Sequence, residues 1–463
     1  MTTTRFPNSS YQPPVRFSIE PYSASNPNTF AYQSTIKRWP MILTNIIDRM
    51  VKINNSLLDE GGDHQNDKLK HGKLIISQIS ELKYQCARDK ELGPIIDDGG
   101  QNLVLYNEEL KKAKAANKST WFTASWLFAE CYLYRRLNSF FMSSEHWKTY
   151  DPFHEPKTSC LQASFPAILK LATTLNLSIS NLDPINEDQL RTSFRGFLLA
   201  SLWGNATDLS LLPTISSEAI YELQSENRSD SSRILKDDFE TLYKRMNENL
   251  NHKKENGYED VKRIDIVLDN AGFELFTDLV LADWFISISP FATKVVFHPK
   301  DIPWFVSDVM EKDIKGLLEA LIEYNDVEVL EPLVKRWKEH FVTKKWEIAH
   351  EYTSVWTSPF PFWDLPNQSQ ELWKDLKSSD LVIFKGDLNY RKLTGDANWE
   401  TTVRFEDSIG PLESLINLLS LRTCKADVVV GLRNGLQKEM DETDPEWRIN
   451  GKYGMISFSK QEP

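Results

Sequence analysis

Residues 264–274 read Ile-Asp-Ile-Val-Leu-Asp-Asn-Ala-Gly-Phe-Glu, an apolar run rich in β-branched residues that stops abruptly at two polar ones. The run Ile264–Leu268 is typical of a buried strand in an α/β sheet. The amphipathic stretch 274–286 predicts the helix that follows. Asp269 and Asn270 would then stand at the carboxyl end of the strand, where open α/β sheets bind their ligands.

The polar residues of this turn suit a metal site. Asp269 and Asn270 offer oxygen ligands side by side, and Gly272 allows a ligand to approach the backbone. A divalent metal bound to a phosphate group needs these features. An ordinary strand-to-helix turn, with Asn and Gly as turn-forming residues, explains the same residues about equally well. The choice between the two interpretations therefore depends on the sequence downstream.

A second polar cluster follows another predicted strand. Asp380–Phe384 has the character of a buried strand, and it is followed by Lys-Gly-Asp-Leu-Asn-Tyr-Arg at 385–391. Gly386 permits close approach to the backbone, and Arg391 can bind a phosphate through two N–H groups at once. A solvated loop of ordinary polar residues is the alternative interpretation.

A third cluster, Leu-Arg-Thr-Cys-Lys at 421–425, precedes a predicted strand over Ala426–Gly431. Arg422 and Lys425 at the entry to a strand can bind one anion together. Two surface cations near the carboxyl end of a helix explain the pair equally well when it is viewed alone.

The pattern of the chain divides near residue 250. A chain of 463 residues is too long for one compact core, so we expect a helix-rich portion over 1–250 and an α/β portion over 251–463. The predicted helices of the first portion cover 38–54, 72–92 and the nearly all-apolar segment 120–136. The polar stretches 54–71 and 249–260 have the composition of loops or linkers.

The second portion alternates between strand and helix patterns. Strands are predicted near 264–269, 294–298, 380–386, 426–431 and 453–459, with a long helical stretch at about 311–350. This alternation predicts a Rossmann-like three-layer αβα domain, on which the helix-rich portion packs, so that the whole is α/β or, more broadly, α+β. The three polar clusters should meet in the cleft between the two portions.

Three charged residues interrupt the apolar segment 120–136, namely Glu130, Arg135 and Arg136. Burying an unpaired charge is costly, so these side chains must form ion pairs or line a cleft. A structural ion pair is the favoured interpretation, and contact with a ligand is the alternative.

The charge balance limits the classes of partner. Lys plus Arg number 54 and Asp plus Glu number 66, a formal net charge of −12, which argues against nucleic acid or an anionic membrane. A phosphate-binding protein of this charge must gather its cations locally, as at Arg391, Arg422 and Lys425. Four scattered cysteines indicate a reducing compartment,. With no signal region and no apolar span, we expect a cytoplasmic protein that could also enter the nucleus.

Taken together, the three clusters resemble a known family, the metal-dependent damage-control phosphatases, in the eukaryotic subfamily marked by Arg-Thr-x-Lys. The resemblance rests on Asp-Asn-Ala-Gly-Phe-Glu at 269–274, Lys-Gly-Asp-Leu-Asn-Tyr-Arg-Lys-Leu at 385–393 and Arg-Thr-Cys-Lys at 422–425. It also includes Ile-Pro-Trp-Phe-Val-Ser-Asp at 302–308 and the segment 121–136. It extends from about Arg38 to about Gly431, without departures at the motif positions. Proteins of this kind have also been described as acidic-residue methyltransferases.

The resemblance implies a hydrolase that removes phosphate from phosphorylated sugars. Fructose 1-phosphate is the best single guess, and damaged or side-product phosphometabolites are the wider class. It implies that Asp269, Asn270 and Asp308 hold a divalent metal, Mn²⁺ or Mg²⁺, with Co²⁺ or Ni²⁺ as further candidates. For Asp308 the alternative role is the N-cap of the next helix. The residues implied in substrate binding are Glu274, Asp387, Asn389, Arg391 and Lys425. A monomer is favoured.

Two other functions compete with this one. An S-adenosylmethionine-dependent protein-glutamate carboxyl methyltransferase would usually carry a Gly-rich turn after its first strand, whereas the turn at 269–274 has one glycine. A non-catalytic binding protein on the same fold would not need the intact Asp, Asn, Arg and Lys positions. The histidines form no cluster, and His154 and His298 are better explained as packing or surface residues. No Ser-His-Asp pattern or Walker motif is present.

Overall fold

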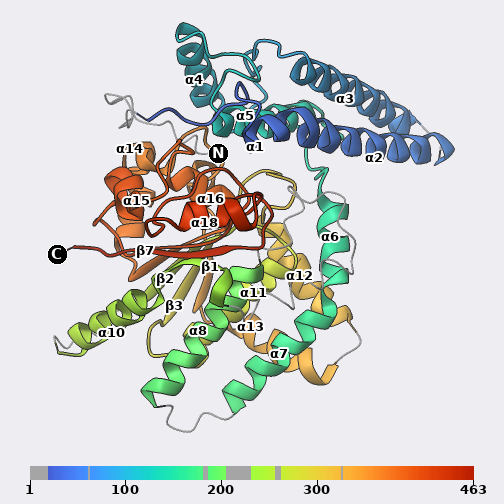
Figure 1. The fold of residues 1–463 in the computed structure, drawn as a ribbon. Coiled ribbons are helices and arrows are strands. Elements are labelled where there is room, and N and C mark those ends of the chain that lie inside the picture. Colours follow the sequence, from blue (N-terminus) through green and yellow to red (C-terminus); the bar gives the residue numbers. More distant parts are fainter. Residues whose placement is uncertain are drawn as a thin grey trace.

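The structure, a computed structural model, describes residues 19–60, 63–180, 186–204, 231–255, 262–324 and 327–462 of the chain. A seven-stranded sheet crosses the molecule with helices on both faces, and further helices lie across one end (Figure 1). The predicted α/β class, with a helix-rich portion packed on a layered αβα arrangement, is therefore confirmed. Among the described residues, no helix combines the length and apolar character needed to cross a membrane.

The sheet has the strand order β1-β7-β6-β5-β2-β3-β4. All neighbouring strands are parallel except β6 and β7, which are antiparallel. From β2 the chain continues to β3 and β4 on one side, and then returns to β5 and β6 on the other, so the order reverses between β2 and β5. Ligands of open α/β sheets bind at such a reversal. The strands are β1 Ile234–Asp237, β2 Arg263–Val267, β3 Lys294–His298, β4 Trp346–Ile348, β5 Leu381–Lys385, β6 Leu418–Thr423 and β7 Gly454–Ser459.

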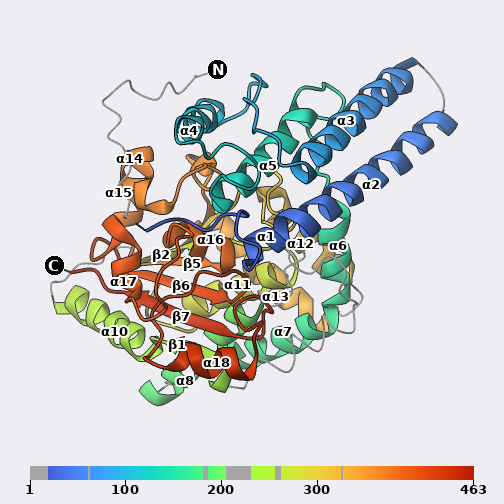
Figure 2. The same ribbon diagram turned by 45° about the horizontal axis from the view of Figure 1, so that its top comes forward.

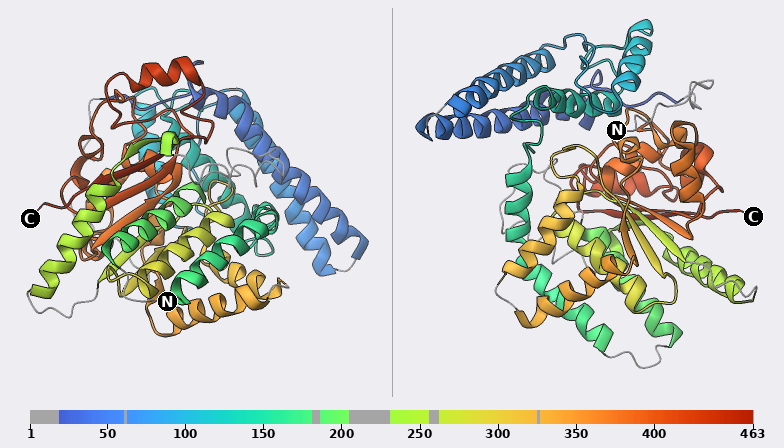
Figure 3. Two further views of the ribbon diagram at one scale, coloured as in Figure 1. Left: turned by 60° about the horizontal axis from the view of Figure 1, so that its bottom comes forward. Right: turned by 180° about the vertical axis from the view of Figure 1, so that it is seen from behind.

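One face of the sheet is covered by long helices whose apolar side chains form a single core cluster with it. Figures 1 and 3 show these helices gathered on the same side of the strands. A parallel sheet must bury both faces, and these helices bury the first. They are α7 Phe165–Ser180, α8 Glu187–Gly204, α10 Phe239–Glu255, α11 Phe273–Ser287, α12 Glu311–Glu323 and α13 Val327–Val342.

The opposite face is covered by shorter elements that build a second core cluster. Most of them follow β4 and β5 in the chain, which is why they lie on the other side of the sheet from the helices that follow β2 and β3. They are η4 Thr353–Val355, η5 Phe362–Asp364, α14 Leu365–Gln368, α15 Gln370–Lys377, α16 Gly386–Leu393, α17 Phe405–Ser408, η6 Gly410–Leu412 and α18 Leu436–Thr443.

The remaining helices form what we call the helical layer, α1 to α5. Its longest members, α2 and α3, make an antiparallel hairpin that extends away from the sheet (Figure 2). Helix α6 His154–Ala163 leads from this layer to the helices below the sheet (Figure 1). The layer consists of α1 Phe30–Gln33, the π-helical turn η1 Ser34–Arg38, α2 Trp39–Glu60, α3 Asp63–Ala87, α4 Leu103–Ala115 and α5 Trp126–Met142.

The core of the helical layer includes residues from the segment 302–308, from the second polar cluster and from the position directly after the third. Its apolar cluster contains Trp304, Phe305 and Val306 from the segment 302–308, together with Leu388 and Ala426. The layer therefore packs directly on the loops that carry the candidate site residues.

One predicted strand was wrong. Residues 426–431 are mostly buried but form no strand, and β6 occupies the preceding residues instead. The N–H of Val430 donates to the hydroxyl of Tyr390 at 3.0 Å, and the N–H of Gly431 donates to a loop carbonyl. The backbone of this apolar run is thus satisfied by loops rather than by a neighbouring strand. Arg422 consequently lies at the end of a strand and not at the entry to one.

Other element boundaries also differ from the predictions. Of the stretch 54–71, predicted as a loop, residues 54–60 belong to α2 and residues 63–71 to α3, while 61 and 62 lie outside the described residues. The long helical stretch at 311–350 is divided into α12, α13 and the short strand β4. Helix α10 continues to Glu255, and the rest of the predicted loop 249–260 lies outside the described residues. Strand β1 and helices α7 and α8 precede residue 250 yet belong to the sheet layers, and the domain limit at 250 stays a prediction.

Candidate active site

The predicted metal ligands meet at the point where the strand order reverses. Asp269 and Asn270 follow β2, and Asn270 forms an antiparallel bridge with Asp308. The carbonyl of Asp269 accepts the N–H of Val309 at 2.7 Å. Asp308 therefore returns to the same edge of the sheet, as predicted. It does not cap the next helix, because the N-cap of α12 is Met310.

The side chain of Asn270 has a fixed orientation. Its Nδ2 donates to Oδ2 of Asp269 and to Oε2 of Glu274, each at 2.8 Å. Its Oδ1 accepts the hydroxyl of Ser307. Because both carboxylates can only accept, the network assigns the amide orientation without ambiguity. Glu274, four residues after Asn270, is thus joined to it by a hydrogen bond.

The end of β5 closes on the end of β2. Gly386 has φ of +81°, and a Cβ atom built on it would lie 1.8 Å from Oδ2 of Asp269. Three residues later, Nδ2 of Asn389 donates to the carbonyls of Lys385 at 2.7 Å and of Val267 at 3.3 Å. The geometry of Asn389 therefore ties the two strand ends together, and its contact with substrate stays a prediction.

The second and third motifs are joined through Asp387. Its Oδ1 accepts Nε of Arg422 at 2.7 Å and the backbone N–H of Lys425 at 3.1 Å. Arg422 also donates to the carbonyls of Val428 at 2.6 Å and Ala426 at 3.1 Å. Arg422 is thus engaged in shaping the loop after β6, and that loop brings Lys425 to Asp387. Burial lowers the pKa of Arg422, but the attraction of Asp387 outweighs it and raises this pKa above its ordinary value.

Arg391 lies one turn after Asp387 on α16 and is held by two carboxylates. Its Nη1 donates to Glu130 of α5 at 2.7 Å, and its Nε and Nη2 donate to the carboxylate of Asp396 at 3.2 and 3.0 Å. Its guanidinium stacks 3.7 Å from the ring centroid of Trp126. The structural ion pair predicted for Glu130 is therefore confirmed.

A buried lysine, Lys385, forms ion pairs with Glu274 and with Asp278 of the same helix. Nζ of Lys385 lies 2.9 Å from Oδ1 of Asp278 and 3.3 Å from Oε1 of Glu274. The pKa of Asp278 is raised to about 7, mainly by burial and also by the nearby charge of Glu274, against the opposing effect of Lys385. Burial lowers the pKa of Lys385, but the attraction of Asp278 and Glu274 outweighs it, so the ammonium stays charged.

Two further lysines near the site were not assigned from the sequence. Nζ of Lys300 donates to the carbonyl of Leu268 at 2.7 Å and lies 3.5 Å from Oδ2 of Asp308. Nζ of Lys392 donates to the carbonyl of Ser358 at 2.9 Å, and burial lowers its pKa to about 8. Lys300 lies just after β3, so the rule that selected Asp269, a polar residue following a strand, would also have selected it.

The donor set suits a divalent metal that prefers oxygen. Asp269 and Asp308 supply carboxylates and Asn270 an amide oxygen, the ligand types of Mg²⁺ and Mn²⁺ rather than of structural zinc. In the described part of the chain, no group of three or more His, Cys, Asp or Glu side chains is arranged around a common metal position. A set of two carboxylates and one amide is compatible with that finding.

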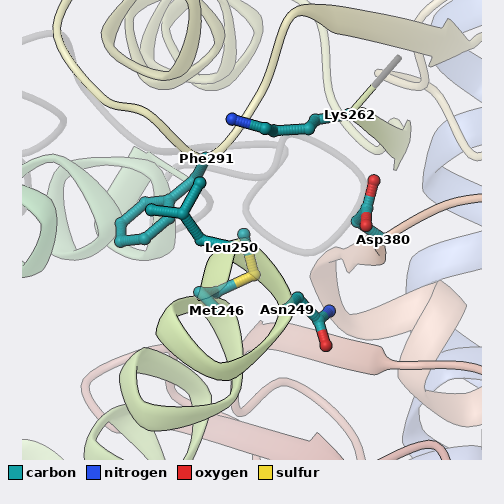
Figure 4. Close-up of a pocket in the computed structure, with 6 residues that line it drawn as sticks. All are labelled: Met246, Asn249, Leu250, Lys262, Phe291 and Asp380. Carbon is teal, nitrogen blue, oxygen red and sulfur yellow. The ribbon is translucent and has the colours of Figure 1, made fainter. Parts of the chain in front are cut away.

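The candidate site is closed to solvent in this structure. All eight predicted site residues are 5 % exposed or less. The pocket in Figure 4 lies elsewhere, since Lys262 and Asp380 precede β2 and β5 and so mark the opposite edge of the sheet. Its lining consists of Met246, Asn249, Leu250, Lys262, Phe291 and Asp380.

Fold and site together define an α/β protein whose acidic and basic motif residues converge where the strand order of its sheet reverses. The model of the damage-control phosphatase ARMT1-like domain matches residues 34–440. The chain therefore belongs to the ARMT1-like damage-control phosphatase family.

Curated relatives extend over nearly the same length. Damage-control phosphatase ARMT1 of Xenopus tropicalis is 37% identical over 441 residues, which cover 94% of this chain and 98% of that protein. The human protein of the same name is 33% identical, with 94% and 97% covered. A DUF89 family protein from Pyrococcus horikoshii, known as a crystal structure, aligns with a TM-score of 0.40 and 14% identity over 91% of this chain and 98% of that one. The methyltransferase alternative finds no support in the family or in these relatives.

Proposed function

We propose that this protein is a divalent-metal-dependent phosphatase that hydrolyses phosphorylated sugars such as fructose 1-phosphate, together with related damaged or side-product phosphometabolites. The observation that carries the proposal is the bridge between Asn270 and Asp308, which unites residues far apart in the sequence beside Asp269. Family membership and the names of the relatives support the same reaction class.

Asp269, Asn270 and Asp308 would hold the metal. When bound, a divalent ion supplies a Lewis acid for phosphoryl oxygens and lowers the pKa of a coordinated water. The hydrogen bonds of Asn270 serve this purpose, because its amide nitrogen is occupied by Asp269 and Glu274. Its carbonyl oxygen accepts the hydroxyl of Ser307, and an amide oxygen has a second lone pair that a metal could use,.

Positive side chains would stabilise the phosphoryl group. The transition state of phosphoryl transfer spreads negative charge over the peripheral oxygens, so fixed cations accelerate the reaction mainly by electrostatic stabilisation. Lys425 and Arg391 would supply such cations, since the backbone N–H of Lys425 contacts Asp387 and Arg391 lies one turn after Asp387 on α16.

Acidic and amide groups would recognise the sugar. Carboxylates accept hydrogen bonds from hydroxyl groups, so Glu274 and Asp387 suit the hydroxyls of a phosphorylated sugar. Asn389 is the further candidate from the sequence. The enclosed site also fits a small polar substrate, because closure removes competing water from the charged groups.

The decisive experiment is phosphate release by the purified full-length protein. After chelation, we expect no release from fructose 1-phosphate, and we expect Mn²⁺, Mg²⁺, Co²⁺ or Ni²⁺ to restore it. Asp269→Asn should stay inactive, whereas Asp380→Asn, which changes an acid at the opposite edge of the same sheet, should retain activity. Absence of release from a panel of sugar phosphates with all four metals would contradict the proposal.

The cellular location and the oligomeric state of the enzyme are part of the same proposal. We infer a small-molecule phosphatase of the cytoplasm, with the nucleus as a further location, that acts as a monomer. Light scattering of the pure protein and imaging of a tagged chain would test these two points. A stable dimer or an organellar location would contradict them.

A further inference from the structure

Arg391 has most of its hydrogen-bonding capacity committed. A guanidinium carries five N–H donors, and three of those of Arg391 are used by Asp396 and Glu130. Trp126 covers one face of the guanidinium plane. Only the two remaining N–H groups can reach a phosphoryl oxygen without breaking an existing bond, and the surrounding carboxylates decide where they point.

Glu130 is in turn held by two residues of the helical layer, Trp39 and Arg38. Its Oε1 accepts Nε1 of Trp39 at 3.0 Å, and Nη2 of Arg38 lies 3.8 Å from the same oxygen. Both partners belong to the start of the long α2 helix and the turn before it. The carboxylate therefore has one oxygen fixed by the helical layer and the other free to orient Arg391. A rigid chain of contacts runs from α2 through α5 to α16.

We propose that Glu130 is a positioning residue for Arg391, so that the helical layer completes the phosphoryl-binding side of the site. This inference rests on the proposed phosphatase function. Asp396 fixes one edge of the guanidinium and Trp126 fixes its face. Glu130 fixes the remaining end, and thereby selects which N–H groups stay available to the substrate. A misplacement of about 1 Å at a reacting group can cost on the order of 10²-fold in rate.

The same helix offers a matched control. Asp98 forms a bidentate pair with Arg135 of α5 at 2.7 and 2.8 Å. The side chains of Asp98 and Glu130 are each 1 % exposed. Both carboxylates therefore neutralise a buried arginine and both stabilise the packing of α5. Only Glu130 contacts an arginine of the candidate site.

The test compares three variants of the metal-loaded protein with wild type, using phosphate release from a sugar phosphate. Glu130→Ala should lower kcat/KM by about tenfold to a hundredfold, mainly through kcat. Glu130→Gln keeps one oxygen for Arg391 and should recover part of this loss. Asp98→Ala should lower the melting temperature at least as much as Glu130→Ala but leave kcat/KM within about twofold of wild type. Equal kinetic losses in Asp98→Ala and Glu130→Ala would overturn the inference.

A double variant separates positioning from general destabilisation. If Glu130 acts through Arg391, adding Glu130→Ala to Arg391→Lys should cause little further loss, because the oriented group is already gone. Additive losses would overturn the inference, and so would wild-type kinetics in a folded Glu130→Ala protein. Both results presuppose an active wild type. An inactive wild type would instead overturn the proposed function, so the two failures are distinguishable. Should Glu130→Ala fail to fold, Glu130→Gln provides the same comparison.

Discussion

The carboxylate of Asp269 rests against the backbone of Gly386. A methyl group on Gly386 would lie 1.8 Å from Oδ2 of Asp269, and the residue has φ of +81°. These two residues follow the strands between which the chain order reverses. The contact leaves no room for a side chain, so the carboxylate opposite requires a glycine at this position.

Gly386→Ala should therefore inactivate the protein and destabilise it. The left-handed conformation costs an alanine about 1–2 kcal/mol, and the carboxylate must also move. Gly316→Ala is the control, because a Cβ at Gly316, within α12, meets no atom within 4 Å. That variant should gain up to about 1 kcal/mol. Denaturant unfolding and phosphate release measure both effects, and an active, stable Gly386→Ala protein would contradict the argument.

Removal of a predicted metal ligand should abolish activity without unfolding the chain. Asp269→Ala and Asp308→Ala each delete a carboxylate from an oxygen donor set. Loss of Asp308 also removes the carboxylate that lies 3.5 Å from the ammonium of Lys300, and the added positive charge further weakens binding of a cation. Calorimetric titration with Mn²⁺ and phosphate release check this. Full activity of the wild type after exhaustive chelation would rule out the metal role.

The two cations should matter for the chemical step. Arg391→Lys and Lys425→Ala should each lower kcat/KM for sugar phosphates by on the order of 10²–10³. An ammonium cannot reproduce the bidentate contact of Arg391 with Asp396, so Arg391→Lys should also lose on the order of 3 kcal/mol of stability. Release from fructose 1-phosphate at saturating Mn²⁺ is the measurement. Wild-type rates in both variants would remove these residues from the mechanism.

Asp278 should make stability depend on pH. Burial raises its pKa to about 7 from an ordinary value of 3.8. Between these values the folded protein holds a proton that the unfolded chain has released, so the free energy of unfolding falls as pH rises from about 4 to 7. Lys385 and Glu274 are the charged groups that face Asp278.

Asp278→Asn removes this titration. Relative to wild type, the variant should gain on the order of 1–3 kcal/mol as pH rises from about 5 to about 8. Urea unfolding at the two pH values tests the difference. A gap between variant and wild type that does not change with pH would show that Asp278 titrates normally.

Much of the sheet could be predicted because its central strands are apolar runs with polar ends. Strands β2, β3, β5 and β7 were found in this way. The run Val428–Val430 has the same composition, yet its backbone is satisfied by tertiary contacts such as the hydroxyl of Tyr390. Strand β4, Trp346–Ile348, is too short to produce a period of its own and was absorbed into a predicted helix.

The convergence of Asp269, Asp308 and Gly386 was predictable for a topological reason. Residues that follow parallel strands collect at one edge of a sheet, so position along the chain is a guide to position in space. The partners of buried charges follow no such rule. Sequence alone indicated that Glu130 needed a cation, but nothing in its neighbourhood identified Arg391, 261 positions later.

That separation bears on how the chain is made. During synthesis the helical layer emerges long before α16, so Arg38, 3.8 Å away, is the cation that faces Glu130 within this layer until Arg391 has left the ribosome. A buried carboxylate that lacks its hydrogen-bonded cation is unfavourable, and contacts so distant in sequence form slowly. We expect nascent chains arrested before Arg391 to expose α5 to proteases, and chains arrested well beyond Asp396 to protect it. Stable packing of the N-terminal helices would then occur late, because it depends on Arg391, the same residue that is proposed to bind the phosphoryl group.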